Sequence, residues 1–101
     1  MLAADRFYVW VYSRRNGTVT DFKLYFDQHW KLGRVLDRVA QIVGIQNDNN
    51  LATAPKLHLF HGNTGQKLLN DLPLHQAVEN GMSVIIEKGI EEANPSDVFP
   101  Q

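Results

Sequence analysis

Apolar residues between positions 30 and 45 recur with the period of an α-helix, and this is the strongest element that the chain predicts. Six of them share one face of such a helix: Leu32, Val35, Leu36, Val39, Ile42 and Val43. Gly44 can adopt the left-handed conformation that ends a helix, whereas no capping residue stands before Lys31. The pattern predicts a helix over Lys31–Val43, long enough to cover one small sheet.

Alternation predicts strands on both sides of this helix. Residues 6–12 and 20–26 flank a turn at Asn16-Gly17 and should form a hairpin, whose inward side chains are Phe7, Val9, Val11, Phe22, Leu24 and Phe26. Beyond the helix we expect a strand over 56–60, a glycine turn with a short edge strand over 66–69, a helical turn over 72–78 and a last strand over 82–87. This order predicts an α+β fold of the β-grasp type, in which a mixed sheet of four to five strands surrounds one main helix.

A β-grasp sheet is covered by its helix on one face only, so the other face meets water or a partner. Alternation places a set of mostly aromatic side chains there: Tyr8, Trp10, Tyr12, Tyr25, His58, Phe60 and Ile85. Each aromatic side chain can bury about 150–250 Å² in a contact, so even part of this set exceeds the few hundred Å² usual for an apolar patch on a monomer. The alternative is that β-propensity alone selects aromatic residues on an open sheet face. We expect a partner-binding surface centred on Trp10 and His58 and formed by Tyr8, Trp10, Tyr12, His58, Phe60 and Ile85.

Composition limits the other function classes. A chain of 101 residues with a formal net charge of −1 and dispersed basic residues predicts one domain that binds neither nucleic acid nor a membrane. The absence of cysteine excludes disulfides, thiolate nucleophiles and cysteine-ligated zinc, and it is typical of a reducing compartment. The cytoplasm is the expected location, with the nucleus as a second one.

The residues that could carry chemistry do not form a known constellation. His58 and His61 lie near each other in a strand and turn, but no acidic or cysteine ligand accompanies them, so we expect no metal site. Gly62 and Gly65 flank a turn without the lysine and helix of a phosphate loop, and no nucleophile elbow or carboxylate pair appears. The sequence predicts no enzyme and no cofactor.

The last residues differ in composition from the rest of the chain. Residues 90–101 hold three acidic residues, two prolines and no basic residue, which is too little apolar content to order a segment. We therefore predict a folded domain over residues 5–89 and a disordered acidic tail over 90–101 that is dispensable for folding.

Three stretches carry a resemblance to a known family. RFYVWVY near the start, HWKLGRVLD at the helix and NDNNLATAPKLHLF after it resemble the C-terminal ubiquitin-like domain of the AN-type zinc-finger proteins that associate with the valosin-containing AAA ATPase. The resemblance covers about residues 5–88. It implies a monomeric, non-catalytic adaptor that docks on the N-terminal domain of the ATPase and links its parent protein to the proteasome under proteotoxic stress such as arsenite.

Two departures bear on what the resemblance implies. Lys88-Gly89-Ile90 follows the last strand without a Gly-Gly terminus, so the chain does not look like a conjugated modifier. The turn after Phe60 lacks the Phe-Pro-Arg triplet with which related domains grip the ATPase. The alternative is a β-grasp domain that binds a small GTPase, which basic residues along the second strand would favour, but only Lys23 stands there.

Overall fold

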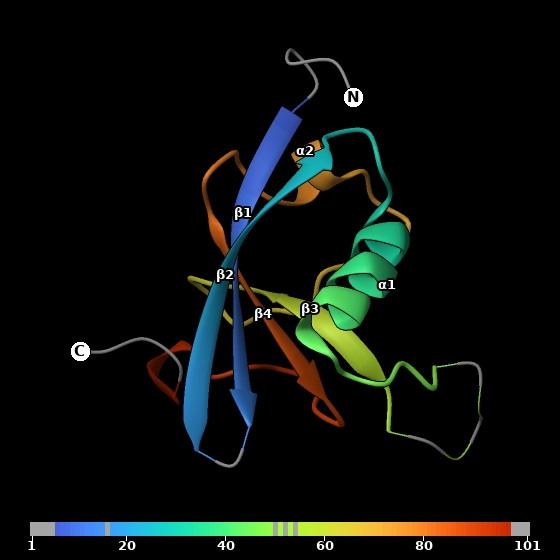
Figure 1. Cartoon of the computed structure of the whole chain (residues 1–101), viewed down its shortest axis with the longest axis vertical. Coiled ribbons are helices and arrows are strands. Elements are labelled where there is room, and N and C mark those ends of the chain that lie inside the picture. Colours follow the sequence, from blue (N-terminus) through green and yellow to red (C-terminus); the bar gives the residue numbers. More distant parts are fainter. Residues whose placement is uncertain (1–5, 16, 50, 52, 54, 98–101) are drawn as a thin grey trace.

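The computed structural model describes residues 6–15, 17–49, 51, 53 and 55–97 (Figure 1). A four-stranded sheet has the order β2-β1-β4-β3. Its strands are β1 (Arg6–Arg15), β2 (Thr18–Asp27), β3 (Leu57–His61) and β4 (Ser83–Lys88), and its helices are α1 (Leu32–Val43), α2 (Leu74–Ala77) and the 3-10 turn η2 (Pro95–Asp97). The two central strands β1 and β4 run parallel, while the outer pairs are antiparallel. The predicted β-grasp fold is confirmed, with the helix α1 on one face of the sheet.

The N-terminal hairpin extends further than alternation predicted. Its register runs from Arg6 opposite Asp27 to Arg15 opposite Thr18, so each strand continues to the turn. Gly17 takes a φ of 79°, as a tight hairpin turn requires, and Asn16 lies outside the described residues. Alternation did not predict the residue pairs beside this turn because the residues there are polar. The hydrogen bonds of a strand pair are formed by backbone groups, which any residue supplies.

The core lies between α1 and the sheet. Leu32, Val35, Leu36 and Val39 are buried there, as predicted, together with Val9 and Val11 of β1 and Leu57 and Leu59 of β3. Ile42 is the exception among the predicted helix positions, since 40% of it is exposed. It stands at one edge of the apolar stripe, and Ala40 at the opposite edge occupies the buried place. Gly44 ends the helix with a φ of 84°.

The predicted edge strand over 66–69 is reduced to isolated pairing. The amide of His61 donates to the carbonyl of Gln66 over 2.8 Å, and the amide of Leu68 donates to the carbonyl of Leu59 over 2.9 Å. Among the described residues the only bridges of this stretch are isolated ones, such as Phe60 with Lys67. The sheet therefore has the lower of the two predicted strand numbers, and the predicted helical turn is present as α2.

The asparagine-rich loop after α1 has a structural role. The side chain of Asn49 pairs with the backbone of β3 as a neighbouring strand would. Its Oδ1 accepts from the amide of Leu57 over 2.7 Å, and its Nδ2 donates to the Leu57 carbonyl over 2.9 Å. The Lys56 ammonium donates to the carbonyls of Asn49 and Leu51. Asn47 donates to the Asp37 carboxylate of α1 over 2.8 Å. The bonds of Asn49 and Lys56 satisfy backbone groups that the loop would otherwise leave unpaired.

The C-terminal segment over residues 90–97, which we call the strap, packs on the sheet. Figure 1 shows the strap and α1 on opposite sides of the sheet. Ala93 is only 4% exposed, and its amide donates to the Gly65 carbonyl over 2.8 Å. Glu92 forms a β-bridge with Gln66. The prediction of a disordered tail is therefore wrong for residues 90–97, because a few backbone bonds and one small buried side chain order a segment whose composition is polar.

Residues 98–101 of the predicted tail, and Asp5 at the start of the predicted domain, lie outside the described residues. The domain boundaries at 5–89 stay a prediction.

Candidate functional site

The sheet face opposite α1 is divided into two halves by how it is covered. On β1 and β2, Tyr8 stands opposite Tyr25 and Trp10 opposite Lys23. These four residues form what we call the aromatic half. On the other side of the face, Tyr12 of β1 stands beside Ile85 of β4, which in turn faces Phe60 of β3. Ile85 and Phe60, over which the strap packs, form what we call the covered half, and Tyr12 lies at its border.

The aromatic half is organised around one ammonium group. The Lys23 Nζ lies 4.6 Å from the ring centroid of Tyr8, 5.7 Å from that of Tyr25 and 5.8 Å from that of Trp10. The rings of Tyr8 and Tyr25 are 5.8 Å apart and tilted by 47°. Tyr25 is 47% exposed, and Tyr8 and Trp10 are half-buried. Cation–π contacts of this kind hold the long lysine side chain over the rings.

Such a surface suits the recognition of another protein. Tyrosine and tryptophan offer large, stiff contact areas with a polar tip, and they are enriched among the residues that dominate binding energy. Lys23 adds one charge that can select an acidic neighbour on a partner. Tyr8, Trp10 and Tyr25 lie on the sheet face opposite the helix, as predicted.

The covered half differs from the prediction. Phe60 and Ile85 lie on the expected face, but both are 0% exposed, since they form a second buried cluster with Ala93. Tyr12 and Ile90 pack against the edge of this cluster. Phe60 and Ile85 therefore cannot contact a partner while the strap is in place. Ile90 and Ala93 were not predicted as part of this surface, because their only signal in the sequence is that they are the apolar residues of a polar stretch.

His58 borders the covered half. Its ring lies 6.3 Å from the Phe60 ring in an edge-to-face arrangement. The Nδ1 atom is buried and has no hydrogen-bond partner among the described residues. Burial, and then the nearby Lys67 ammonium, lower the pKa of His58 below its ordinary 6.5, while the Glu91 carboxylate of the strap acts in the opposite direction. His58 is thus kept neutral beside the strap, where a charged imidazole would lose hydration.

Trp10 and His58 lie apart on the sheet. Trp10 pairs with Ser83 of β4, whereas His58 pairs with Glu87 at the other end of that strand. Four residues along a strand and two strand spacings across the sheet separate them by about 16 Å. Alternation gives the face of a residue but not its distance along the sheet, so a single contact centred on both residues would have to span this distance. That both residues belong to one contact stays a prediction.

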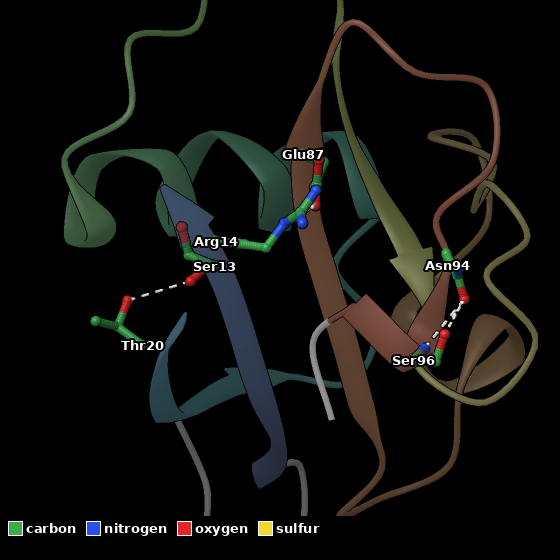
Figure 2. Close-up of polar contacts among 6 residues, drawn as sticks. All are labelled: Ser13, Arg14, Thr20, Glu87, Asn94 and Ser96. Carbon is green, nitrogen blue, oxygen red and sulfur yellow. Dashed lines mark hydrogen bonds and ion pairs between the residues drawn. The ribbon is translucent and has the colours of Figure 1, made fainter. Parts of the chain in front are cut away.

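Polar side chains border the covered half toward the hairpin end of β1, on the side away from the aromatic half. Figure 2 shows Arg14 reaching from β1 toward Glu87 of β4, with 3.7 Å between Nε and Oε1. The carbonyl of Ser13 accepts a 3.4 Å hydrogen bond from the Thr20 hydroxyl. An ion pair this exposed contributes little stability, so Arg14 and Glu87 act mainly as a hydrophilic border.

The strap starts its 3-10 turn with a local polar motif, also drawn in Figure 2. The Asn94 Oδ1 accepts from the amide of Ser96 over 3.1 Å and from its hydroxyl over 2.7 Å. Asparagine turns of this kind fix the backbone without a partner from the rest of the fold. The motif therefore shapes the end of the strap rather than anchoring it.

No group of three or more histidine, cysteine, aspartate or glutamate side chains that could hold a metal ion occurs within the part of the chain that the structure describes. None of the helices in that part is long and apolar enough to span a membrane.

Comparison with solved structures places the fold in the ubiquitin-like class. The ubiquitin of Caldiarchaeum subterraneum superposes with a TM-score of 0.59 at 13% identity, over 80% of this chain and 90% of that one. A chain of a pParkin-pUb-UbcH7 complex gives a TM-score of 0.63 at 10% identity, over 86% of this chain and 24% of that chain. At this level of identity the likeness concerns the fold.

Comparison of sequences identifies the family. The model of the ZFAND1-like ubiquitin-like domain matches residues 25–90, and the chain belongs to this family. The AN1-type zinc finger protein 1 of Mus musculus is 31% identical over 90 residues, and that of Homo sapiens is 29% identical; each match covers 82% of this chain and 34% of the relative. The chain thus spans about a third of the length of these relatives. The predicted resemblance to AN-type zinc-finger proteins is confirmed.

Proposed function

We propose that this domain is a non-catalytic interaction module that docks a parent AN1-type zinc finger protein onto the N-terminal domain of the valosin-containing AAA ATPase. The family assignment supports an interaction module, since ubiquitin-like domains are typically non-catalytic. The observation that carries the proposal is the aromatic half, a cluster of three aromatic rings around Lys23 on the sheet face that α1 leaves open. Without a Phe-Pro-Arg turn the chain needs a different contact surface, and this half supplies one.

Within the docking surface, Trp10 is the main anchor. It is half-buried in the free domain, so its ring is already held in place by its neighbours and loses little freedom on binding. Tyr8 and Tyr25 surround it, and Tyr12 lies at the border with the covered half. His58 lies further along the face and contributes only if the partner extends over the strap. Phe60 and Ile85 are not part of the docking surface.

The domain works as one part of a longer protein. In this proposal the parent protein recruits the ATPase through this domain and reaches the proteasome through its other parts, in protein quality control under arsenite or other proteotoxic stress. The domain itself is a monomer, needs no cofactor and binds neither nucleic acid nor membrane. It acts in the cytoplasm, with the nucleus as a second location.

The test is a titration of the N-terminal domain of the ATPase into wild-type, Trp10→Ala and Arg34→Ala chains. A central aromatic residue that becomes desolvated is worth about 2 kcal/mol or more, so Trp10→Ala should weaken binding roughly thirtyfold. Arg34 is the matched control, because its guanidinium also lies over an aromatic ring, 3.7 Å from the centroid of Trp30, but belongs to α1. Lys23→Ala should have a smaller effect that decreases with added salt.

Circular dichroism of each variant serves as the folding control. If Arg34→Ala abolishes binding and Trp10→Ala does not, the contact lies on the helix side and the assigned surface is wrong. Capture of a small GTPase from cell extract in place of the ATPase would favour the alternative function.

A further inference from the structure

The strap lies on the sheet as an extended peptide ligand would. Its backbone pairs with the glycine turn, since Glu92 bridges to Gln66 and the Ala93 amide donates to the Gly65 carbonyl. Two residues before Ala93, Glu91 forms a 2.6 Å ion pair with Lys67 while its side chain stays 91% exposed. Ala93 itself is buried against Phe60 and Ile85.

The site under the strap is shaped for close approach of a backbone. A Cβ atom on Gly65 would overlap the Ala93 carbonyl oxygen and would come within 3.2 Å of the Pro95 ring. Only a residue without a side chain therefore lets an extended chain cross at this point. The floor of the site consists of Phe60 and Ile85, two large side chains that are 0% exposed. The site thus combines a backbone edge, an apolar floor and the Lys67 ammonium.

The strap itself contributes few contacts in return. Among its described side chains, Ala93 is the one in the buried class, Ile90 and Pro95 are half-buried, and the others are exposed: Glu91, Glu92, Asn94 and Ser96. Alanine buries little apolar area, and an exposed ion pair such as Lys67 with Glu91 adds little stability. The strap is therefore held weakly on this site, and another chain with the same features can replace it.

We propose that the covered half is a second binding site, for an extended peptide that carries an acidic residue followed two positions later by a small apolar residue, and that the strap is its resident intramolecular ligand. The acidic residue pairs with Lys67, the small residue rests on Phe60 and Ile85, and the backbone between them pairs with Gln66. A partner segment of this pattern displaces residues 90–97. The site does not depend on the aromatic half or on any partner that docks there.

The first test measures whether the strap opens separately, by hydrogen exchange on the wild-type chain. The amide of Ala93, bonded to Gly65, is compared with the amide of Trp10, which donates to the Met82 carbonyl over 3.0 Å inside the sheet. A segment that detaches alone exchanges faster than the strands beneath it, and we expect a difference of at least about a hundredfold. Equal protection of both amides would mean that the strap opens only on global unfolding, and the proposal would be wrong.

The second test supplies the ligand from outside. A synthetic peptide with the sequence of residues 88–97 is titrated into the wild-type chain and into Ala93→Arg, while the amide signals of Gln66 and Ile85 are followed by NMR. The arginine cannot fit on Phe60 and Ile85, so the variant releases its own strap. We expect saturable binding to Ala93→Arg and at least tenfold weaker binding to wild type, because a tethered ligand has an effective concentration on the order of millimolar.

Two controls accompany this titration. Asn94→Arg adds the same charge at the neighbouring exposed position and should behave as wild type, and a peptide with arginine in place of its alanine should not bind. If Ala93→Arg does not fold by circular dichroism, a chain ending at Ile90 takes its place. Equal responses of wild type and the released variant, or no saturation by about 10 mM peptide, would overturn the proposal.

Discussion

The aromatic half and the covered half share one face of one sheet but meet different surroundings. Tyr25 of the aromatic half is 47% exposed, whereas Phe60 and Ile85 of the covered half are 0% exposed. Both sets follow from the same strand alternation, and both are apolar enough to bind a partner. The difference comes from eight residues beyond the last strand, which cross one half and leave the other open. Alternation therefore assigns a side chain to a face, while the path of a distant segment decides whether that face is available.

This comparison also separates two kinds of function. The aromatic half can receive a partner without any rearrangement of the chain, since its rings and Lys23 are already in contact. The covered half requires release of the strap first, so binding there competes with an intramolecular contact.

The sharpest comparison is between Phe60→Ala and Tyr25→Ala. If the covered half is a core, the loss of the Phe60 ring should lower the free energy of unfolding by about 3–5 kcal/mol. Tyr25→Ala, at a largely exposed position of the aromatic half, should cost less than about 1 kcal/mol. Urea denaturation gives both values. Equal costs would show that the strap does not bury its half of the face in solution.

Leu36→Ala gives the corresponding value for the helix-covered face. Leu36 is 2% exposed, and its truncation should cost about 2–5 kcal/mol, as is usual for a buried leucine. Ile42→Ala in the same helix is the matched control and should change stability by less than about 0.5 kcal/mol, because that position is exposed. A cost for Leu36→Ala below that of Ile42→Ala would contradict the packing of α1.

Removal of residues 91–101 tests the strap directly. Deleting it should expose on the order of 40–120 Å² of apolar surface on Phe60 and Ile85, equivalent to about 1–3 kcal/mol of stability. This expectation reverses the sequence prediction that the segment is dispensable for folding. A chain that lacks only residues 98–101 keeps the strap and serves as the control. Equal thermal stability of the two shortened chains would restore the original prediction.

The smallest expected effect is a dependence on pH. The pKa of His58 lies below its ordinary 6.5 in the folded chain, so the unfolded chain binds this proton more tightly. Stability should therefore be complete above about pH 6.5 and decrease as the pH falls below that value. The Lys67 ammonium also lowers the pKa of the Glu91 carboxyl, so protonation of Glu91 in more acid solution weakens the strap further. His58→Gln should remove the decrease just below pH 6.5; an unchanged profile would show that His58 is not its cause.

The fold was predictable because its strongest signals are local. The helical period of residues 32–43 and the alternation of the hairpin each required only neighbouring residues, and the order of elements then limited the topology. The asparagine-rich loop that supports the family resemblance also has a local explanation, since Asn49 pairs with the backbone of β3. The predictions that failed concern the edges of elements: the burial of Ile42 and the strand pairing of Gln66. Tertiary contacts decide both.

The candidate site was predictable only in part. The face of every candidate could be inferred, but the cover over Phe60 and Ile85 depends on Ala93, a residue that no periodic pattern marks. The cation–π contacts of Lys23 depend on its register opposite Trp10, which the hairpin turn determines. Distances along the sheet, such as that between Trp10 and His58, require the register of a parallel strand pair formed by residues far apart in the chain.

Gly65 gives the strap a marker that can be read in other sequences. The Ala93 carbonyl oxygen occupies the space of a Cβ at residue 65, and the φ of 76° there already disfavours other residues. A relative with any other residue at this position cannot route its C-terminal segment over the turn in the same way. Such relatives should expose the counterparts of Phe60 and Ile85 at all times. A single residue in the turn should therefore distinguish domains whose second site is covered by a strap from domains in which that site is always open.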